Sequence, residues 1–279
     1  MNQATERATQ RATQRAPARQ APETVLALSP EAGRLTGRVA LVTGGGRGAG
    51  RAHARLLALR GASVVIVDID AEVARATAAE IEQAGGRALA LTADITRRDL
   101  AERVIHEAAD RFGGIDIIVH NAGMMYSLTG LEHTDDDNFN QLLSINVHAP
   151  LFLTRAALPY LRKSRAPRVI FINSQWGQVP DGHSYGYMVA KAAQLGLMKT
   201  MAKEFVGEGI LVNAVTPGAI LTRMVPDEYI EGEQQAIPLG RLAHPEEIAS
   251  TVAFLASDEA AFIAGQSIPV NGGALVVGI

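Results

Sequence analysis

The chain has 279 residues, of which 47% are hydrophobic and 20% charged, and its net charge of −3 gives no electrostatic case for nucleic acid or a membrane surface as a partner. This length and composition fit one large globular α/β domain, or less well two small domains. The absence of cysteine excludes disulfides, thiolate zinc sites and a cysteine nucleophile, and the seven histidines show no ligand-like spacing, so we expect no metal.

The first 36 residues differ from the rest of the chain. A tetrapeptide repeat over Ala4–Arg15 places arginines at four-residue intervals, and prolines follow it. A helix of this sequence would have a basic stripe but no apolar face to bury. We therefore expect residues 1–36 to be a disordered extension, followed by a single domain over residues 37–279. A transit peptide is the alternative, although the repeat lacks serine. Because neither a signal sequence nor a membrane span is evident, a cytoplasmic protein is expected.

From Gly37 onward, short apolar runs alternate with stretches of helical length. We expect strands at Val39–Thr43, Ser63–Asp68, Ala88–Thr92, Ile115–His120, Arg168–Asn173, Leu211–Val215 and Ser267–Val270. We expect helices at Arg51–Arg60, Ala71–Ala84, Asp99–Phe112, Phe139–Arg162, Tyr187–Val206 and Pro245–Leu255. Continuous apolar strands separated by helices predict a doubly wound parallel sheet of seven strands, with helices on both faces. The segment Leu221–Ile237 breaks this rhythm and is expected to cross the carboxyl ends of the strands.

A glycine-rich loop follows the first expected strand. It reads Thr43-Gly-Gly-Gly-Arg-Gly-Ala-Gly50 and leads into a helix. Glycines let the backbone turn tightly and bring N–H groups against a pyrophosphate, whose charge a helix N-terminus favours. Two frames fit: one fixes Gly44, Gly46 and Ala49, and the other fixes Gly44, Gly48 and Gly50. Because a strand precedes the loop and a helix follows it, either frame predicts a dinucleotide site.

The second expected strand ends in Asp68, eighteen residues after Gly50. A carboxylate at this position accepts from the ribose hydroxyls of NAD and repels the 2′-phosphate of NADP. The next residue is Ile69, which is not basic, and this also argues against NADP. Arg47 in the glycine loop argues the other way, because it could reach a 2′-phosphate. We favour NAD, with NADP as the weaker alternative.

Tyr187 and Lys191 are four residues apart, and Ser174 lies thirteen residues before Tyr187. In a helix, this spacing puts Tyr187 and Lys191 on one face. A tyrosine has a pKa of about 10, but a nearby ammonium favours the phenolate and lowers that pKa. A serine hydroxyl can bind the same substrate oxygen, so the three residues form a candidate proton-transfer set. Tyr185 cannot play this part, because Val189 stands four residues after it.

Several motifs occur together and in a familiar order. They are Thr43-Gly-x-x-x-Gly-x-Gly50, Asp94, Asn121-Ala122-Gly123, Asn146, Ser174, Tyr187-x-x-x-Lys191 and Pro217-Gly218. With them the chain resembles the short-chain dehydrogenase/reductase family over roughly residues 35–273. The resemblance implies a Rossmann-type fold and hydride transfer between a nicotinamide cofactor and an alcohol or ketone.

The resemblance also implies roles for individual residues. Tyr187 would be the general acid–base and Ser174 would hold the substrate oxygen. Lys191 would lower the pKa of Tyr187 and bind the nicotinamide ribose, and Asn146 would position a water that links Lys191 to solvent. The further cofactor contacts would be Asp94, Ile95, Asn121, Ala122, Gly123, Pro217, Gly218, Ile220 and Thr222. His120, where the family often has asparagine, is expected to be structural.

The substrate pocket is the part that the sequence determines least. By position, Met124, Met125, Trp176, Gln178, His183 and Met224 could line it. This set favours an apolar or cyclic secondary alcohol as the small-molecule substrate. The alternatives are an NADP-linked ketoreductase of the 3-oxoacyl-carrier-protein type and a non-catalytic dinucleotide-binding regulator. The resemblance further implies a homotetramer, in which the apolar end Ala274–Ile279 would suit burial at a subunit contact.

Overall fold

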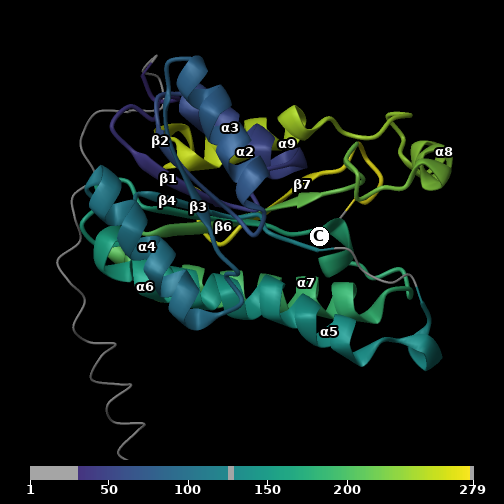
Figure 1. Cartoon of the computed structure of the whole chain (residues 1–279). Helices are drawn as coiled ribbons and strands as arrows, with labels where there is room; N and C mark the ends of the chain where they lie inside the picture. The colour runs from purple at the N-terminus through teal and green to yellow at the C-terminus, as the bar shows by residue number, and fades with distance from the viewer. Residues whose placement is uncertain (1–30, 125–128, 277–279) are drawn as a thin grey trace, which may run out of the picture.

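A seven-stranded parallel sheet forms the centre of the molecule (Figure 1). The computed structural model describes residues 31–124 and 129–276, so the arginine repeat, Met125 and the last three residues of the chain lie outside it. The strands are β1 (Val39–Thr43), β2 (Ser63–Asp68), β3 (Arg87–Thr92), β4 (Ile117–His120), β5 (Arg168–Ile172), β6 (Leu211–Pro217) and β7 (Ser267–Val270). Their order is β3-β2-β1-β4-β5-β6-β7, and each neighbouring pair is parallel. This confirms the predicted fold class.

Helices cover both faces of the sheet (Figure 1). They are α2 (Gly48–Leu59), α3 (Ala71–Gln83), α4 (Arg98–Phe112), α5 (Asp136–Leu143), α6 (Ala149–Leu161), α7 (Tyr185–Phe205), α8 (Asp227–Ala236) and α9 (Pro245–Ala256). Apolar side chains of α4, α6 and α7 form one core with the sheet, and those of α2, α3 and α9 form the other. Within the described ranges, no helix combines the length and the apolarity that crossing a membrane requires.

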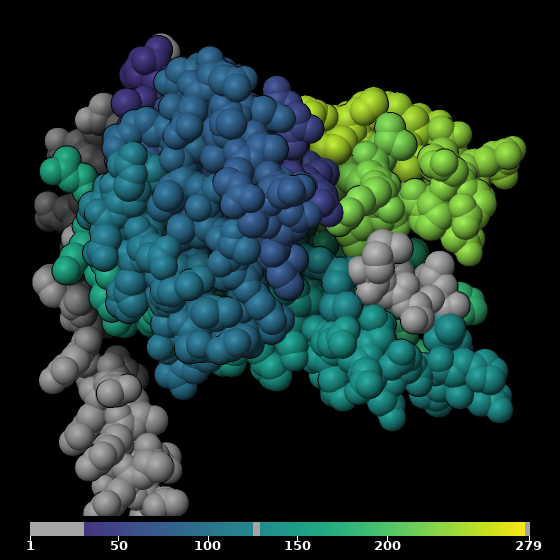
Figure 2. Space-filling model, viewed as in Figure 1, coloured from purple at the N-terminus to yellow at the C-terminus, as the bar shows by residue number. Residues whose placement is uncertain are grey.

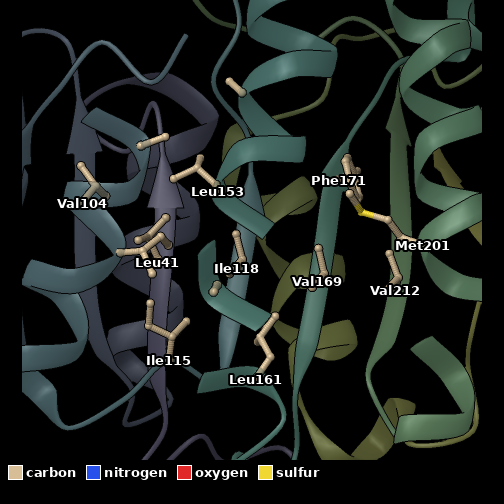
Figure 3. Close-up of a cluster of buried hydrophobic side chains, with 14 of the residues drawn as sticks. Leu41, Val104, Ile115, Ile118, Leu153, Leu161, Val169, Phe171, Met201 and Val212 are labelled. Atoms are coloured by element: carbon tan, nitrogen blue, oxygen red, sulfur yellow. The ribbon is translucent and has the colours of Figure 1, made fainter. Parts of the chain in front are cut away.

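The alternation of side chains along β1 explains the two cores. Leu41 belongs to the core under α4, α6 and α7, whereas Ala40 and Val42 belong to the opposite core. Figure 3 shows Leu41 in the first core with Ile118 and Phe171 of neighbouring strands. Because β1 is buried on both faces, it appears in the sequence as a continuous apolar run rather than an alternating one.

The helix predicted over residues 139–162 is interrupted. α5 ends at Leu143, a π-helical segment follows at Ser144–His148, and α6 begins at Ala149. Pro150 gives the physical reason, because proline has no N–H to donate and its ring crowds the carbonyl four residues earlier. That carbonyl belongs to Asn146, and a widened turn relieves the crowding.

Other boundaries differ by a few residues. α2 begins at Gly48 rather than Arg51, and α7 begins at Tyr185 rather than Tyr187. Neither helix start has a capping side-chain hydrogen bond, so the usual sequence signal for a helix start is missing. β4 begins two residues later than predicted, whereas β6 continues to Pro217.

The segment 221–237 contains α8 and lies near the carboxyl ends of β1 and β7. Its first turn brings the Thr222 methyl beside Gly48 of the glycine loop. Just beyond the segment, the Leu239 N–H donates to the Gly272 carbonyl after β7 (3.2 Å). Figure 2 shows the green part of the chain, with α8, and the teal part, with α5, projecting at the same end of the molecule.

Candidate active site

The glycine loop between β1 and α2 is held in a conformation that only glycine readily adopts. Gly44 and Gly48 have φ angles of 60° and 50°, in the left-handed region where a Cβ atom is unfavourable. A Cβ on Gly50 would overlap the Gly44 carbonyl oxygen. Gly44, Gly48 and Gly50 therefore each have a steric reason to be glycine. The same holds for Gly46, whose Cβ would overlap the Val73 side chain, so packing supports the fixed glycines of both predicted frames.

Asn121, at the end of β4, ties this strand to the glycine loop. Its side-chain amide donates to the carbonyls of Thr43 (2.9 Å) and Gly44 (3.2 Å). The Thr43 hydroxyl in turn accepts from the backbone N–H groups of Asn121 and Ala122, both at 3.0 Å. β1 and β4 flank the point where the strand order reverses, which is where open α/β sheets bind ligands. The predicted Asn121–Gly123 contact set thus borders the predicted pyrophosphate loop.

Asp68 at the end of β2 faces the same loop. One carboxylate oxygen accepts from the Gly46 N–H (3.0 Å) and the other from the Asp70 N–H (3.1 Å). Arg47 forms an ion pair with Asp70, and Ile69 is 72% exposed. The basic side chain that could have favoured NADP is therefore engaged by a neighbouring carboxylate.

The other predicted cofactor residues lie at or after the carboxyl ends of β3 and β6. The Asp94 carboxylate accepts from the Thr96 N–H (3.0 Å) and hydroxyl (2.6 Å), which closes the turn after β3. Ile95 points into the hydrophobic core and is 5% exposed, so its backbone is the part left for a cofactor contact. Pro217 ends β6, and Ile220 forms an isolated bridge with Ala243.

Ser174, Tyr187 and Lys191 come together beyond the end of β5. Ser174 follows β5, while Tyr187 and Lys191 lie in the first turns of α7. The Ser174 side chain lies beside the Tyr187 hydroxyl, and the Lys191 ammonium nitrogen is 5.7 Å from the centroid of the Tyr187 ring. Tyr185 is 37% exposed.

Burial dominates the electrostatics of this group. It raises the pKa of Tyr187, and the hydrogen bond with Ser174 acts in the opposite direction. It also lowers the pKa of Lys191 to about 7. The structure thus differs from the expectation of a lowered tyrosine pKa, because desolvation disfavours both the phenolate and the ammonium.

Asn146 lies in the π-helical segment and is fully buried. Its side-chain amide donates to the Leu142 carbonyl (2.9 Å). Its backbone carbonyl accepts from the side-chain amide of Gln194 (3.0 Å). Gln194 and Asn173 were not among the predicted residues, although both are buried here. A glutamine three residues after Lys191 on the buried side of an apolar helix was the available signal.

The predicted substrate residues differ in their surroundings. Trp176 stacks edge-on against Tyr187, and Met124 is half-buried directly after the Asn121–Gly123 set. Gln178 donates to the Ser267 hydroxyl (3.4 Å). His183 and Met224 are exposed. In the described part of the chain, no three His, Asp or Glu side chains cluster as metal ligands would.

Known proteins with similar sequences identify the class of this protein. Residues 44–274 match the family described as Enoyl-(Acyl carrier protein) reductase. The chain is 38% identical over 245 residues to the 2,5-dichloro-2,5-cyclohexadiene-1,4-diol dehydrogenase LinX of Sphingobium indicum, which covers 87% of this chain and 98% of LinX. It is 37% identical over 244 residues to the 3-oxoacyl-[acyl-carrier-protein] reductase FabG of Escherichia coli, covering 86% of this chain and 98% of FabG.

Solved structures agree with this assignment. A dehydrogenase/reductase from Sinorhizobium meliloti superposes with a TM-score of 0.84 at 37% identity, over 88% of this chain and 98% of the other. Levodione Reductase superposes with a TM-score of 0.83 at 33% identity, over 86% and 98%. The chain belongs to the short-chain dehydrogenase/reductase family and is an oxidoreductase acting on CH–OH groups with NAD(P).

Proposed function

We propose that the protein is an NAD-dependent dehydrogenase that interconverts a secondary alcohol, apolar or cyclic, with its ketone. The observation that supports this most is the Ser174–Tyr187–Lys191 group, set beyond β5 of the same sheet whose β1 leads into the glycine loop. Proton transfer and dinucleotide binding thus lie at the carboxyl ends of one sheet.

The loop after β1 fits the pyrophosphate of a dinucleotide. Gly44, Gly48 and Gly50 leave the backbone free of side chains where α2 begins, and a helix N-terminus favours a phosphate. Asp68 is placed to accept from ribose hydroxyls, and the Arg47–Asp70 ion pair weakens the case for a 2′-phosphate. When bound, NAD supplies the hydride acceptor.

The roles of the catalytic residues follow from their protonation chemistry. In oxidation, Tyr187 takes the proton of the substrate hydroxyl, and in reduction it returns that proton to the ketone oxygen. Ser174 holds the same substrate oxygen by a hydrogen bond. The Lys191 ammonium stabilises the phenolate of Tyr187, which offsets part of the desolvation that the buried group suffers.

The preference for an apolar or cyclic substrate rests on two supports. The first support is apolar surface: Trp176 packs against Tyr187, and Met124 directly follows Gly123 in the chain. The name of LinX states that this relative acts on a substituted cyclohexadienediol. Similarity to FabG favours a second candidate, an NADP-linked reductase of 3-oxoacyl thioesters.

Initial rates distinguish these candidates. NAD⁺ and NADP⁺ would be compared with cyclohexanol, menthol and sorbitol, and NADH and NADPH with an acetoacetyl thioester. Faster oxidation of cyclohexanol or menthol with NAD⁺ supports the proposal. Turnover of sorbitol alone, or of the thioester with NADPH alone, contradicts it.

We also propose a homotetramer, the usual assembly of this family. Val189 and Val206 leave apolar surface exposed on α7 and directly after it, 44% and 45% accessible. Light scattering after size-exclusion chromatography tests this, and a monomeric mass contradicts it.

A further inference from the structure

Gln194 occupies a central place in a buried polar network behind the catalytic residues. It is 1% exposed. Its amide nitrogen donates to the Asn146 carbonyl (3.0 Å), and its amide oxygen accepts from the Asn173 amide (2.9 Å) and lies 3.5 Å from the Lys191 ammonium. One side chain therefore connects the π-helical segment, the residue after β5 and the lysine.

The partners fix the orientation of this amide. The Asn146 carbonyl can only accept a hydrogen bond, whereas the Lys191 ammonium can only donate. The nitrogen of Gln194 must therefore face Asn146 and its oxygen must face Lys191. The reversed amide would place donor against donor at Lys191 and acceptor against acceptor at Asn146.

The Asn146 carbonyl needs this donor for a reason that lies in the sequence. In an α-helix, a carbonyl accepts from the N–H four residues later, and here that residue is Pro150, which has none. A buried carbonyl without a donor is costly. Gln194, reaching across from α7, donates to this carbonyl, which Pro150 cannot do.

Lys191 depends on the same amide. It is 5% exposed, and its ammonium donates to the Ile172 carbonyl (2.9 Å) in addition to its contact with Gln194. Burial lowers the pKa of Lys191 to about 7, so near neutral pH its charge depends on the oxygens around it. Tyr187 is the ionisable side chain packed against it, and the oxygens that accept from its ammonium are those of the Ile172 carbonyl and the Gln194 amide.

We propose that Gln194 is a positioning residue, which holds the Lys191 ammonium in place beneath Tyr187 by anchoring it to the Asn146 carbonyl. This inference rests on the proposed function. Asn173 supports the arrangement, because its amide nitrogen also donates to the Lys191 carbonyl (2.8 Å) and its oxygen accepts from the Ser174 N–H (2.8 Å). The network thereby connects the positions of Ser174 and Lys191.

Gln194→Met tests the inference, since methionine matches the length of glutamine but provides neither the donor nor the acceptor. Without the amide oxygen, the charged form of Lys191 is less favoured, and the phenolate of Tyr187 loses support. We expect kcat for oxidation of the best alcohol of the panel to fall at least about tenfold. The acidic limb of the pH–rate profile for oxidation, where the rate rises as Tyr187 loses its proton, should move up by about one pH unit, while the KM for NAD⁺ changes much less.

Met198→Ala is the matched control. Met198 lies one turn further along α7, is fully buried and apolar, and takes no part in the network. It should lower the thermal midpoint without moving the pH–rate profile. If Gln194→Met does not fold, Gln194→Asn replaces it, because the shorter amide stays polar but cannot reach both partners.

The outcomes separate this inference from the proposed function. Wild-type kcat and an unmoved pH limb in Gln194→Met, with Tyr187→Phe inactive, would overturn the role of Gln194 alone. The role of Gln194 would also be overturned if Gln194→Met lowered kcat only as much as Met198→Ala does and left the pH limb unmoved. No alcohol oxidation by the wild-type protein would instead overturn the proposed function.

Discussion

The indole ring of Trp176 stands edge-on to the ring of Tyr187, with centroids 6.3 Å apart and an angle of 89° between the planes. Such aromatic pairs add about 0.5–1.5 kcal/mol beyond the area they bury. Trp176 follows Ser174 by two residues, and its N–H group on the backbone donates to the Ser174 hydroxyl oxygen (3.2 Å). The tryptophan thus contacts both hydroxyl-bearing residues of the candidate site.

Trp176→Ala should therefore change which alcohols react more than how NAD binds. We expect the ratio of kcat/KM for menthol to that for a small acyclic alcohol to change about tenfold, equivalent to about 1.4 kcal/mol. The KM for NAD⁺ should stay within about twofold, because the glycine loop and Asp68 lie at the ends of β1 and β2, whereas Trp176 follows β5. An unchanged substrate ratio would remove Trp176 from the pocket.

Tyr187→Phe should abolish most of the activity. The change removes the hydroxyl that transfers the proton and leaves the ring in place, so kcat should fall about 10²–10⁴-fold. Tyr185→Phe is the matched control, two residues away on the same helix and 37% exposed. It should retain wild-type rates. A Tyr187→Phe rate above about a hundredth of wild type would contradict the assigned mechanism.

Asp68→Asn should weaken the preference for NAD. The neutral amide loses the charge-assisted hydrogen bonds to ribose hydroxyls, each worth about 1.5–3 kcal/mol, and no longer repels a 2′-phosphate. We expect kcat/KM for NAD⁺ to fall about tenfold or more, and kcat/KM for NADP⁺ to rise. Asp99→Asn, which disrupts a surface ion pair with Arg97 (3.0 Å), is the control and should change neither value.

Asp70→Asn should raise the activity with NADP⁺ by another route. Asp70 engages Arg47 and also accepts from the Glu72 N–H (3.0 Å) at the start of α3. Asparagine preserves that helix cap but not the ion pair, so Arg47 becomes available to a 2′-phosphate. Steady-state kinetics with both cofactors should show a gain for NADP⁺ and little change for NAD⁺. Equal ratios before and after the change would show that Arg47 does not reach the cofactor.

His120→Asn should reduce the sensitivity of the fold to acid. His53 and His120 are buried, and burial lowers the pKa of each from its ordinary value of 6.5 to about 3. Between these pH values the unfolded chain binds protons that the folded chain does not, so the free energy of unfolding falls as the pH falls through this window. Each histidine contributes about 1.4 kcal/mol per pH unit, or roughly 2 kcal/mol between pH 6.5 and pH 5.

Urea unfolding at several pH values measures this effect. Above pH 7 the variant should be less stable, because His120 packs on Phe171 (centroids 4.8 Å apart) and hydrogen-bonds the Thr154 hydroxyl (2.9 Å). Towards pH 5, however, its stability should decrease less steeply than that of the wild type. Parallel curves would show that His120 is protonated in the folded protein.

The sequence allowed much of the fold to be predicted because both sides of the sheet are covered. Burial on both faces makes β1 and β5 largely apolar runs, which need no knowledge of their neighbours to be recognised. The break before α6 was missed, although Pro150 was visible, because a proline within a helical pattern can also mark a kink in one continuous helix. The starts of α2 and α7 were missed because no capping side chain marks them.

In the candidate site, too, some residues could be predicted from the sequence and others could not. Ser174, Tyr187 and Lys191 could be predicted because their spacing is local or resembles a familiar motif. Gln194 could not, because its value depends on reaching Asn146, 48 residues away along the chain. The Arg47–Asp70 ion pair likewise depends on how the glycine loop lies against the start of α3.

The reversal of strand order between β1 and β4 separates two groups of assigned residues, one at the end of each half of the sheet. β1, β2 and β3 lead into the residues assigned to the adenosine and pyrophosphate part of the dinucleotide, whereas β5 and the helix after it lead into the residues assigned to the proton, the alcohol and the nicotinamide ribose. Changes made in one half share few contacts with those in the other, so their free-energy effects should be additive. The choice of coenzyme and the choice of alcohol can thus be redesigned separately and then combined in one chain.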